Sequence, residues 1–500
     1  MPEVGHPTYD KPYLWAICLV ATLGGFLFGY DWVVVGGAKE FYEAHFGIAG
    51  EGNELAKGWG TSSALIGCII GAVACSFVSD RFGRKRLLIL AGLLFTVSAI
   101  GTAMAGSFAE YNTYRIVGGL AMGIALNVSP LYIAEMSPPA MRGMMVSVNQ
   151  LTIMIGVLSA QVTNWRISLI DTGMPVDATP EVIATSWNGL QGWRWMFGAE
   201  AVPALLFFVL MFLVPESARW LVKSGQLERA HQVFARLGGS DYAEAEVADV
   251  RSTISDKEVG TVRFSDLVEP HVFKVLLLGV FLSFLQQWSG MNAVFYYAAD
   301  IFKAAGYNLK AMMLNIVVIG GVMVLSVFVT MALVDRVGRK TLVLFGCGTL
   351  AVVYILIGAC FHVGILGLPV VLLTLVCVSA YSFTLAPLLW VILSEIYPNR
   401  IRGAAISIAA TAHWVANFIL TFTFPTVSRA LGMAGVFWLF AGVCIVGFVV
   451  VRRVLPETRG KTLEDIEREL LGSAARRLLR GDEAPALTRA RLPRELPPAV

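Results

Sequence analysis

The feature that most constrains this chain is a series of apolar stretches, each close to 20 residues long. A helix of about 20 apolar residues spans a hydrocarbon core of about 30 Å. The sequence therefore predicts an all-α polytopic membrane protein with twelve transmembrane helices in two groups of six. The expected spans are 14–36, 59–79, 87–107, 112–134, 144–165, 195–214, 272–298, 312–334, 341–361, 367–393, 403–425 and 433–452.

Composition agrees with a chain whose main solvent is lipid. Of 500 residues, 56% are hydrophobic and only 15% are charged, against about 25% charged in an average soluble domain. The expected division is an N-terminal segment 1–13, a half 14–214, a linker 215–271 with short amphipathic helices, a half 272–453 and a tail 454–500. Because the tail mixes arginine, alanine and proline without a sustained apolar face, we expect it to contact anionic lipid.

Basic residues are distributed unevenly between the two sets of loops. One set holds the runs 81–86, 219–263, 336–340 and 400–402, with Arg142, Arg452 and Arg453, while the other carries only scattered cations. The positive-inside rule places the rich set, and with it both termini, in the cytoplasm. A multi-pass protein of the plasma membrane, in a bacterium the inner membrane, is expected. The net charge of +3 indicates this topology and no nucleic-acid partner.

Two charged phrases occur twice in the chain. AEMSPPAMRG (134–143) matches SEIYPNRIRG (394–403), and SDRFGRK (79–85) matches VDRVGRK (334–340). Long internal repeats in a helical membrane protein are typical of transporters in which one half rocks against the other around a central site.

The sequence shows no residue pattern that is typical of a metal site or of an enzyme active site. The seven cysteines have no metal-ligand spacing, and most fall inside apolar stretches. No cluster of metal-binding histidines, serine–histidine pair or pair of carboxylates gathers within the spans. The sequence therefore predicts no enzyme, no metal and no cofactor beyond a proton as coupling ion.

An ordered set of motifs resembles the sugar porter family of the major facilitator superfamily. These motifs are DRFGRK and DRVGRK, the paired E(x6)RG phrases, PESARWL, QQWSGMNAVFYY and PETRGKTLEDIE, and the similarity covers residues 13 to about 467. The resemblance implies two six-helix halves related by a pseudo-twofold axis, and a central sugar site. Monosaccharide, proton and membrane lipid are the expected partners.

Two charges fall inside the expected spans at matching depth. Asp31 lies near the outer end of the first span and Arg115 near that of the fourth. A charge inside the bilayer costs about 2.5–3.5 kcal/mol or more, so each needs a partner or a task. An aspartate that exchanges a proton for an arginine partner couples protonation to a conformational change. The resemblance implies this role for Asp31, and the alternative is a permanent ion pair that only braces the helices.

Sugar recognition requires amides that match hydroxyl groups and aromatic faces that match the C–H surface of the ring. In the resembling transporters, ten positions of this kind line the sugar site. They are Phe28, Gln150, Gln286, Gln287, Asn292, Tyr296, Trp390, His413, Trp414 and Asn417. The alternative is that some of these amides only join helices.

Several positions depart from the family pattern and leave the sugar open. Val157 stands where proton-coupled xylose carriers have a second glutamine, and Met323 stands where an asparagine is usual. His413 replaces an amide, and Ala386 replaces a glycine. A hexose is the first candidate, with pentose and polyol as alternatives; for His413 itself, a sugar contact, a structural role and a proton role all remain possible.

The repeated charged phrases are expected at cytoplasmic helix ends, outside the sugar site. Ion pairs there could latch the two halves when the cavity faces outward and break when it faces inward. The expected latch residues are Asp80, Arg81, Arg84, Glu135, Arg142, Asp335, Arg336, Arg339, Glu395 and Arg402. Topology alone is the alternative explanation for the basic residues.

The sequence thus predicts proton-coupled monosaccharide symport by alternating access. A passive sugar uniporter differs only in whether Asp31 titrates during the cycle. A transporter-like sugar sensor is a second alternative, although its tail would be expected to be longer than 454–500.

Overall fold

The computed structural model describes residues 9–171, 178–257, 267, 269–398, 401–459 and 461. Within these ranges the regular elements are helices, without a strand, and eleven helical segments are long and apolar enough to cross a membrane. The last of them, α20 (Arg402–Val454), has 53 residues, about 80 Å of helix, too long for one crossing. Its backbone leaves the helical region at Gly432, where φ is 67°, so α20 supplies the eleventh and twelfth spans. The expected all-α fold is confirmed.

The first half contains long helices that follow one another through the bundle. They are α1 (Lys11–His45), α2 (Glu54–Phe82), α3 (Arg84–Met104), α4 (Phe108–Met136) and α5 (Pro139–Ser168). The sixth span is assembled from η1 (Asn188–Gly192), α7 (Trp193–Gly198) and α8 (Ala201–Leu213), after the short α6 (Pro180–Thr185). Helix α1 runs nine residues beyond the expected span, to His45, and most of these added residues are buried in the protein.

The second half contains two spans that are broken where the first half has unbroken helices. Its elements are α13 (Pro270–Trp288), α14 (Met291–Tyr296), α15 (Ala298–Ala304), α16 (Leu309–Val337), α17 (Arg339–Val363), α18 (Leu368–Phe383), α19 (Leu385–Ile396) and α20. The seventh span breaks at Gly290, whose φ of 89° favours glycine. The tenth breaks at Thr384, three residues before Pro387. Such interruptions occur in membranes where backbone lines a cavity or is buried in protein.

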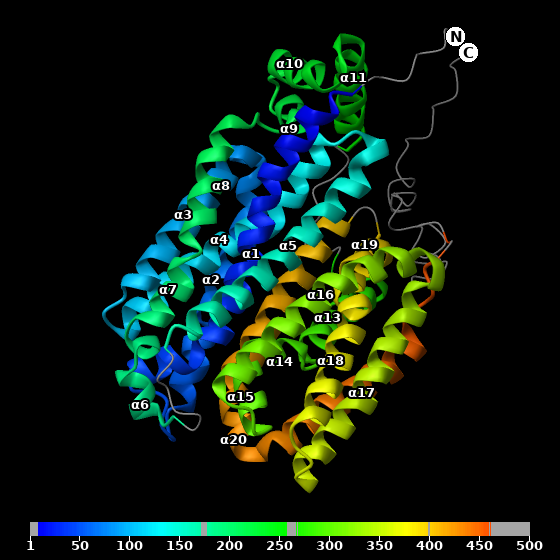
Figure 1. Cartoon of the computed structure of the whole chain (residues 1–500). Helices are drawn as coiled ribbons and strands as arrows, with labels where there is room; N and C mark the ends of the chain where they lie inside the picture. The colour runs from blue at the N-terminus through cyan, green and yellow to red at the C-terminus, as the bar shows by residue number, and fades with distance from the viewer. Residues whose placement is uncertain are drawn as a thin grey trace, which may run out of the picture.

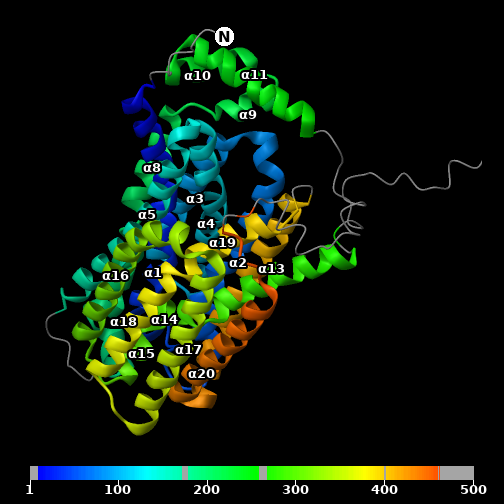
Figure 2. The same ribbon diagram turned by 90° about the vertical axis from the view of Figure 1, so that its right-hand side faces the viewer.

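The two groups of helices stand side by side, and the linker helices cover one end of the first group (Figure 1). These are α9 (Ala218–Lys223), α10 (Leu227–Gly238) and α11 (Ser240–Lys257). The view at 90° agrees (Figure 2). We call this end the linker end, and the end that carries α6 and α15 the far end. The start of α1 packs on the linker helices, since Asp10 N–H donates to the Leu237 carbonyl at 2.9 Å.

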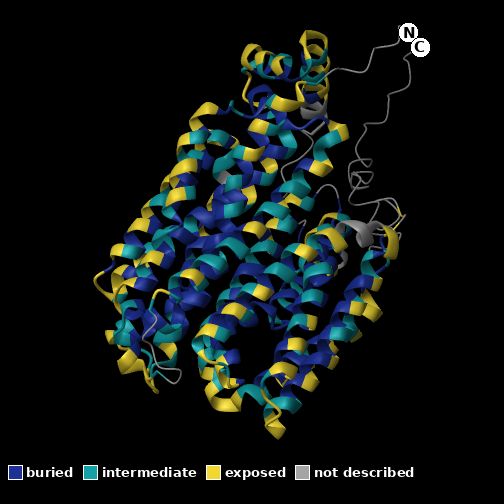
Figure 3. Cartoon of the chain, viewed as in Figure 1, coloured by how far each residue is buried: buried dark blue, intermediate teal, exposed yellow. Residues whose placement is uncertain are grey.

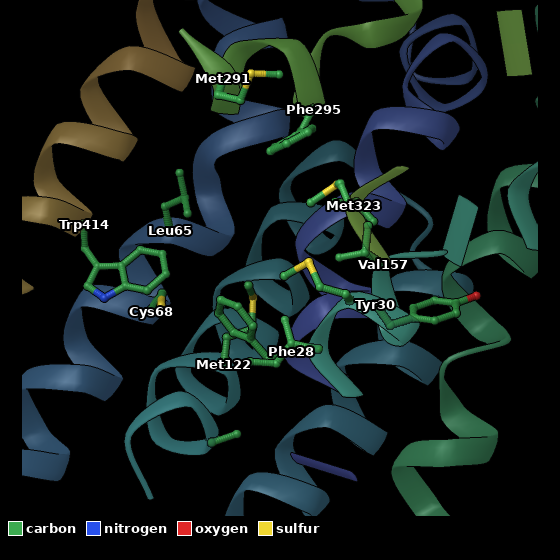
Figure 4. Close-up of a cluster of buried hydrophobic side chains, with 14 of the residues drawn as sticks. Phe28, Tyr30, Leu65, Cys68, Met122, Val157, Met291, Phe295, Met323 and Trp414 are labelled. Atoms are coloured by element: carbon green, nitrogen blue, oxygen red, sulfur yellow. The ribbon is translucent and has the colours of Figure 1, made fainter. Parts of the chain in front are cut away.

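Burial separates the inner faces of the helices from their outer faces (Figure 3). A continuous buried apolar cluster includes residues of both halves, from Leu14 to Leu455. Figure 4 shows its middle, where Phe28 of α1 and Met323 of α16 lie among apolar side chains of several helices. The inner core therefore joins the halves around one central region.

Candidate functional site

A cavity of about 560 Å³ lies between the two halves. Its walls come from α1, α4 and α5 on one side and from α13, α14, α16, α18, α19 and α20 on the other. Nine of the ten expected sugar-site residues line it: Phe28, Gln150, Gln286, Gln287, Asn292, Trp390, His413, Trp414 and Asn417. The volume lies in the range of small-molecule sites, about 300–1,000 Å³.

Buried amides of the seventh span form a connected network in the cavity wall. Gln287 Nε2 donates to Gln286 Oε1 at 3.0 Å, and Asn292 Nδ2 donates to Gln287 Oε1. Gln287 Nε2 also lies 2.5 Å from Nε2 of His413. Asn292 Oδ1 is buried without a hydrogen-bond partner in the described part of the chain. The break at Gly290 turns these side chains toward one cavity, and they offer both donors and acceptors to a hydroxylated ligand.

Aromatic rings provide the apolar surfaces of the same cavity. The ring centroids of Trp390 and His413 lie 5.3 Å apart, and those of His413 and Trp414 lie 5.2 Å apart. Across the halves, Phe28 contacts Trp414 edge to face at 6.2 Å. Trp32, one residue after Asp31, also lines the cavity. A flat ring with an apolar face and polar edges fits such walls.

The remaining expected sugar-site residue and three positions that depart from the family pattern lie either in the cavity lining or behind it. Tyr296 is 2% exposed and does not line the cavity, so the structure places it behind the lining, near Asn417. Val157 is likewise fully buried behind the wall. Met323 and Ala386 line the cavity. The thioether of Met323 therefore contributes apolar surface at a position where the family usually has an amide.

Several polar residues line the cavity that the sequence analysis did not select. They are Ser147, Thr330, Tyr381 and Ser382. Each lies on an apolar helix without a motif around it, so the sequence carries no signal that separates them from ordinary helix hydroxyls.

Asp31 and Arg115 form a buried ion pair inside the first half. Arg115 Nη1 donates to Asp31 Oδ1, and the two residues are 2% exposed or less. The guanidinium also lies 5.1 Å from the ring of Phe197. Neither charge lines the cavity, but Phe28 and Trp32, on the same helix as Asp31, do. The expected proximity of the two charges is thus observed.

A second buried acid, Glu200, completes this cluster. It lies where the sixth span is interrupted between α7 and α8, it is 3% exposed, and it interacts electrostatically with Asp31 and Arg115. Glu200 Oε1 and Asp31 Oδ2 have no hydrogen-bond partner among the described residues. Glu200 was not among the expected site residues, although an acid inside the apolar stretch 195–214 indicates a functional position.

The charged phrases of the first half gather at the linker end. Arg84 pairs with Glu135 at 2.9 Å and with Asp80 at 3.1 Å. Lys223 of the linker pairs with Asp80 at 2.6 Å. Burial raises the pKa of the Asp80 carboxyl, but Lys223 and Arg84 more than offset it and hold the pKa below its ordinary value. Arg142 donates to the Ala134 carbonyl, and Arg81 is exposed over the Phe82 ring.

The second half repeats this arrangement. Arg339 Nε lies 3.3 Å from Glu395, and Arg402 Nε donates to the Tyr397 carbonyl. Arg336 is exposed, and the side chain of Asp335 lies outside the described residues. All ion pairs described for the latch residues are therefore within one half or with the linker. The hypothesis that they join the halves in another conformation stays a prediction.

Two glutamates complete the repeated arrangement and were not selected from the sequence. Glu216 Oε1 accepts the backbone N–H groups of Arg84 and Lys85, each at 2.9 Å. Glu457 Oε1 accepts the N–H of Arg339 at 3.0 Å. Each carboxylate lies at a helix N-terminus, where negative charge is favoured. The signal was present as the Pro-Glu dipeptides of PESARWL and PETRGKT.

Ion pairs that join the two halves occur at the far end. Lys39 of α1 pairs with Asp300 of α15 at 2.8 Å, and Lys303 pairs with Glu40 at 3.0 Å. At the linker end the cavity extends to Gly143, four residues into α5. The halves are thus held together at the far end, and the cavity reaches toward the linker end.

Two helical halves that enclose a polar and aromatic cavity define a secondary transporter of the major facilitator type. A family model described as "Sugar (and other) transporter" matches residues 17–470. The chain therefore belongs to the sugar porter family of the major facilitator superfamily, and it is a multi-pass membrane transporter rather than an enzyme.

Curated relatives match almost end to end. The D-xylose-proton symporter of Escherichia coli K12 is 34% identical over 489 residues, which cover 92% of this chain and 96% of the relative. The arabinose-proton symporter of Bacillus subtilis is 34% identical over 462 residues, with 92% and 96% covered. The galactose-proton symporter of Escherichia coli K12 is 33% identical over 468 residues, with 92% and 95% covered.

Solved structures agree on the fold. An inward open conformation of the xylose transporter of Escherichia coli gives a TM-score of 0.79 at 32% identity, with 91% of this chain and all of that chain covered. The same transporter bound to 6-bromo-6-deoxy-D-glucose gives 0.74 at 34% identity, with 92% and 100% covered.

Proposed function

We propose that this protein carries a monosaccharide across the membrane together with a proton, by alternating access. The observation that carries the proposal is the position of α1 between two sites. Phe28 and Trp32 of this helix line the amide-rich cavity, and Asp31 between them pairs with Arg115 of α4. A change in charge at Asp31 therefore acts on the helix that contacts the ligand.

Charge balance in the buried cluster supports a proton as the coupling ion. Asp31, Glu200 and Arg115 are each 3% exposed or less, and they comprise two acids and one base. With both acids ionised, the cluster holds one uncompensated negative charge in a region where isolated charge is costly. Binding one proton removes this charge, and Arg115 can then pair with either carboxylate. The two acids would share this site as a coupled pair.

The location of the ion pairs supports an inward-facing state. Positive-inside bias assigns the linker end to the cytoplasm, so the cavity that reaches Gly143 would open inward. Lys39 and Asp300 would then close the outer side. In the opposite state these pairs would separate, and the charged phrases at the linker end would approach each other. Both termini would be cytoplasmic, in the plasma membrane, which in a bacterium is the inner membrane.

The identity of the sugar is proposed at the level of monosaccharide. The relatives are named as proton symporters for xylose, arabinose and galactose, so both pentoses and hexoses are candidates. We take a hexose as the first candidate. Met323 lowers the number of amides in the cavity, and His413 introduces an imidazole beside Gln287. The nitrogens of His413 can serve as donor or acceptor to a hydroxyl, depending on the tautomer.

Uptake into proteoliposomes tests the proposal. The purified chain is reconstituted, and labelled glucose, galactose, xylose, arabinose and inositol are offered with an acid-outside gradient or with a protonophore. We expect at least one of these sugars to accumulate above its external concentration only while the gradient persists. Equilibration without accumulation in both conditions would favour a passive uniporter. Binding of a sugar without any flux would favour a sensor.

A further inference from the structure

A second cavity, of about 580 Å³, lies at the linker end of the first half, away from the sugar site. It is enclosed by the first turns of α3, the segment that follows α8, and the linker helices α9 and α10. Three of its lining residues are cationic, namely Lys85, Arg86 and Arg229. The lining also includes Ile89 of α3 and Val233 of α10. We call this cavity the basic pocket.

The cations of the basic pocket outnumber the acid that faces them. Among the described lining residues Glu216 is the one carboxylate. Its Oε1 already accepts the backbone N–H groups of Arg84, Lys85 and Ser217 at 2.8–2.9 Å. Lys85 Nζ donates to the Phe212 carbonyl, and Lys85 is attracted by the charge of Glu216 and repelled by that of Arg229.

Glu216 compensates only part of this positive charge, because the hydrogen-bond partners of Lys85 and Arg229 are neutral. Arg229 donates to the amide oxygen of Gln226 at 2.6 Å. Within the described ranges, Lys85, Arg86 and Arg229 have no carboxylate within 4.0 Å. Three like charges gathered in one hollow favour an anion with several acceptor oxygens.

The surroundings of the basic pocket indicate where that anion comes from. Next to the lining residues along the chain, α3 and α8 expose large apolar side chains. Leu90 is 42% exposed, Leu93 43%, Phe212 54% and Leu213 78%. Such a surface on a membrane helix faces acyl chains. A group held in the pocket therefore lies at the depth of lipid headgroups, beside the end of the apolar belt.

We propose that the basic pocket binds the phosphate group of an anionic phospholipid in the membrane leaflet at the linker end. Arg86 and Arg229 would hold the phosphate from opposite walls, and the acyl chains would lie along α3 and α8. Basic pockets of this kind at the cytoplasmic side of membrane helices suit acidic headgroups. Because Arg229 belongs to α10, occupancy would also fasten the linker to the first half. The proposal for this lipid site does not depend on which solute the protein transports.

Native mass spectrometry of the purified full chain tests this site with dioleoyl phosphatidylglycerol and dioleoyl phosphatidylcholine as probes. We expect wild-type protein to retain one phosphatidylglycerol in preference to phosphatidylcholine. The double variant Arg86→Gln/Arg229→Gln should lose about thirtyfold in affinity, since each basic side chain near a lipid surface contributes roughly fivefold. The matched control Arg452→Gln/Arg453→Gln removes two exposed charges at the end of α20 and should retain the wild-type preference.

Three outcomes would overturn the proposal. The first is a wild-type protein without preference for phosphatidylglycerol, and the second is an equal loss in both double variants. The third is stabilisation by glycerol 1-phosphate as large as that by phosphatidylglycerol, measured as the shift in unfolding temperature, which would make the site one for a free phosphate compound. If the double variant fails to fold, Arg229→Lys keeps the charge and should keep the preference, whereas Arg229→Gln alone should reduce it.

Discussion

Asp31, Arg115 and Glu200 form a buried group of two acids and one base, so binding one proton makes the group electrically neutral. Glu200 supplies the second acid, and Arg115 interacts with both carboxylates. Two acids around one guanidinium form a bistable arrangement, because the base can pair with only one of them fully at a time. The sequence placed the first two at matching depth, but it could not show that the break between α7 and α8 brings Glu200 to the same place.

The variant Glu200→Gln tests the shared proton. It leaves one acid and one base in the cluster. Asp31 is then paired with Arg115 in every state, and binding a proton would leave Arg115 as an uncompensated buried charge. Proton uptake during sugar transport, measured as alkalinisation of a weakly buffered medium, should fall by about tenfold, the equivalent of 1.4 kcal/mol. Sugar binding should persist. Glu181→Gln, an exposed acid at the far end, is the control, and normal alkalinisation by Glu200→Gln would contradict the shared site.

The amide network makes a separate prediction for binding. Gln287→Ala or Asn292→Ala leaves partners unpaired in a buried wall, so sugar binding should weaken by about 1–3 kcal/mol. Trp390→Ala should weaken it through loss of the ring surface. Isothermal titration with the transported sugar measures these changes, with the exposed Gln191→Ala as control. Unchanged affinity in all three variants would place the sugar elsewhere.

At the scale of elements, the spans were predictable from apolar length, but their interruptions were not. The expected spans 272–298 and 367–393 are each divided in two, at Gly290 and at Thr384. A glycine and a nearby proline were visible in these stretches, yet apolar helices often contain both without a break. Gln286 and Gln287 precede the break at Gly290 and Asn292 follows it, and all three line the cavity.

Gly432 gives a test of the turn inside α20. Its φ of 67° is strained for a residue with a side chain, although no atom lies within 4 Å of a Cβ there. Gly432→Ala should therefore lower stability by about 1–3 kcal/mol through backbone strain alone. Gly442→Ala, also on α20 and equally free of neighbours, should not destabilise. Thermal unfolding in detergent compares the two, and equal stability of both variants would contradict the positive φ at Gly432.

The ion pair between Lys39 and Asp300 gives a test of the far-end contact. Lys39 is 3% exposed, and it also pairs with Glu43 at 3.3 Å. Lys39→Met should shift the equilibrium toward far-end opening by about 1–3 kcal/mol, less than for a fully buried pair because Asp300 is partly exposed. Spin labels at Gly50→Cys and Lys310→Cys should report a longer distance population. Arg166→Met is the control, and an unchanged distance distribution would rule out a role in gating.

For the whole molecule, the internal repeats in the sequence predict two halves that carry the same charged phrases. Both copies of the charged phrases fall at the same end. Arg84 pairs with Glu135 and Arg339 with Glu395 within one half each, and Asp80 also pairs with Lys223 of the linker. The repeats could not give the conformational state. That depends on contacts between residues far apart in sequence, such as Lys39 with Asp300, which carry no common motif.

The most direct test of the central claim compares wild type with Asp31→Asn in the same proteoliposomes. Asparagine keeps the shape of the side chain but cannot release a proton, so the driving force can no longer act on α1. We expect wild-type protein to accumulate sugar and alkalinise the medium, and Asp31→Asn to bind and exchange sugar without accumulating it. An Asp31→Asn protein that still concentrates sugar in step with the proton gradient would contradict the proposal, and wild-type protein that never accumulates sugar would establish passive transport.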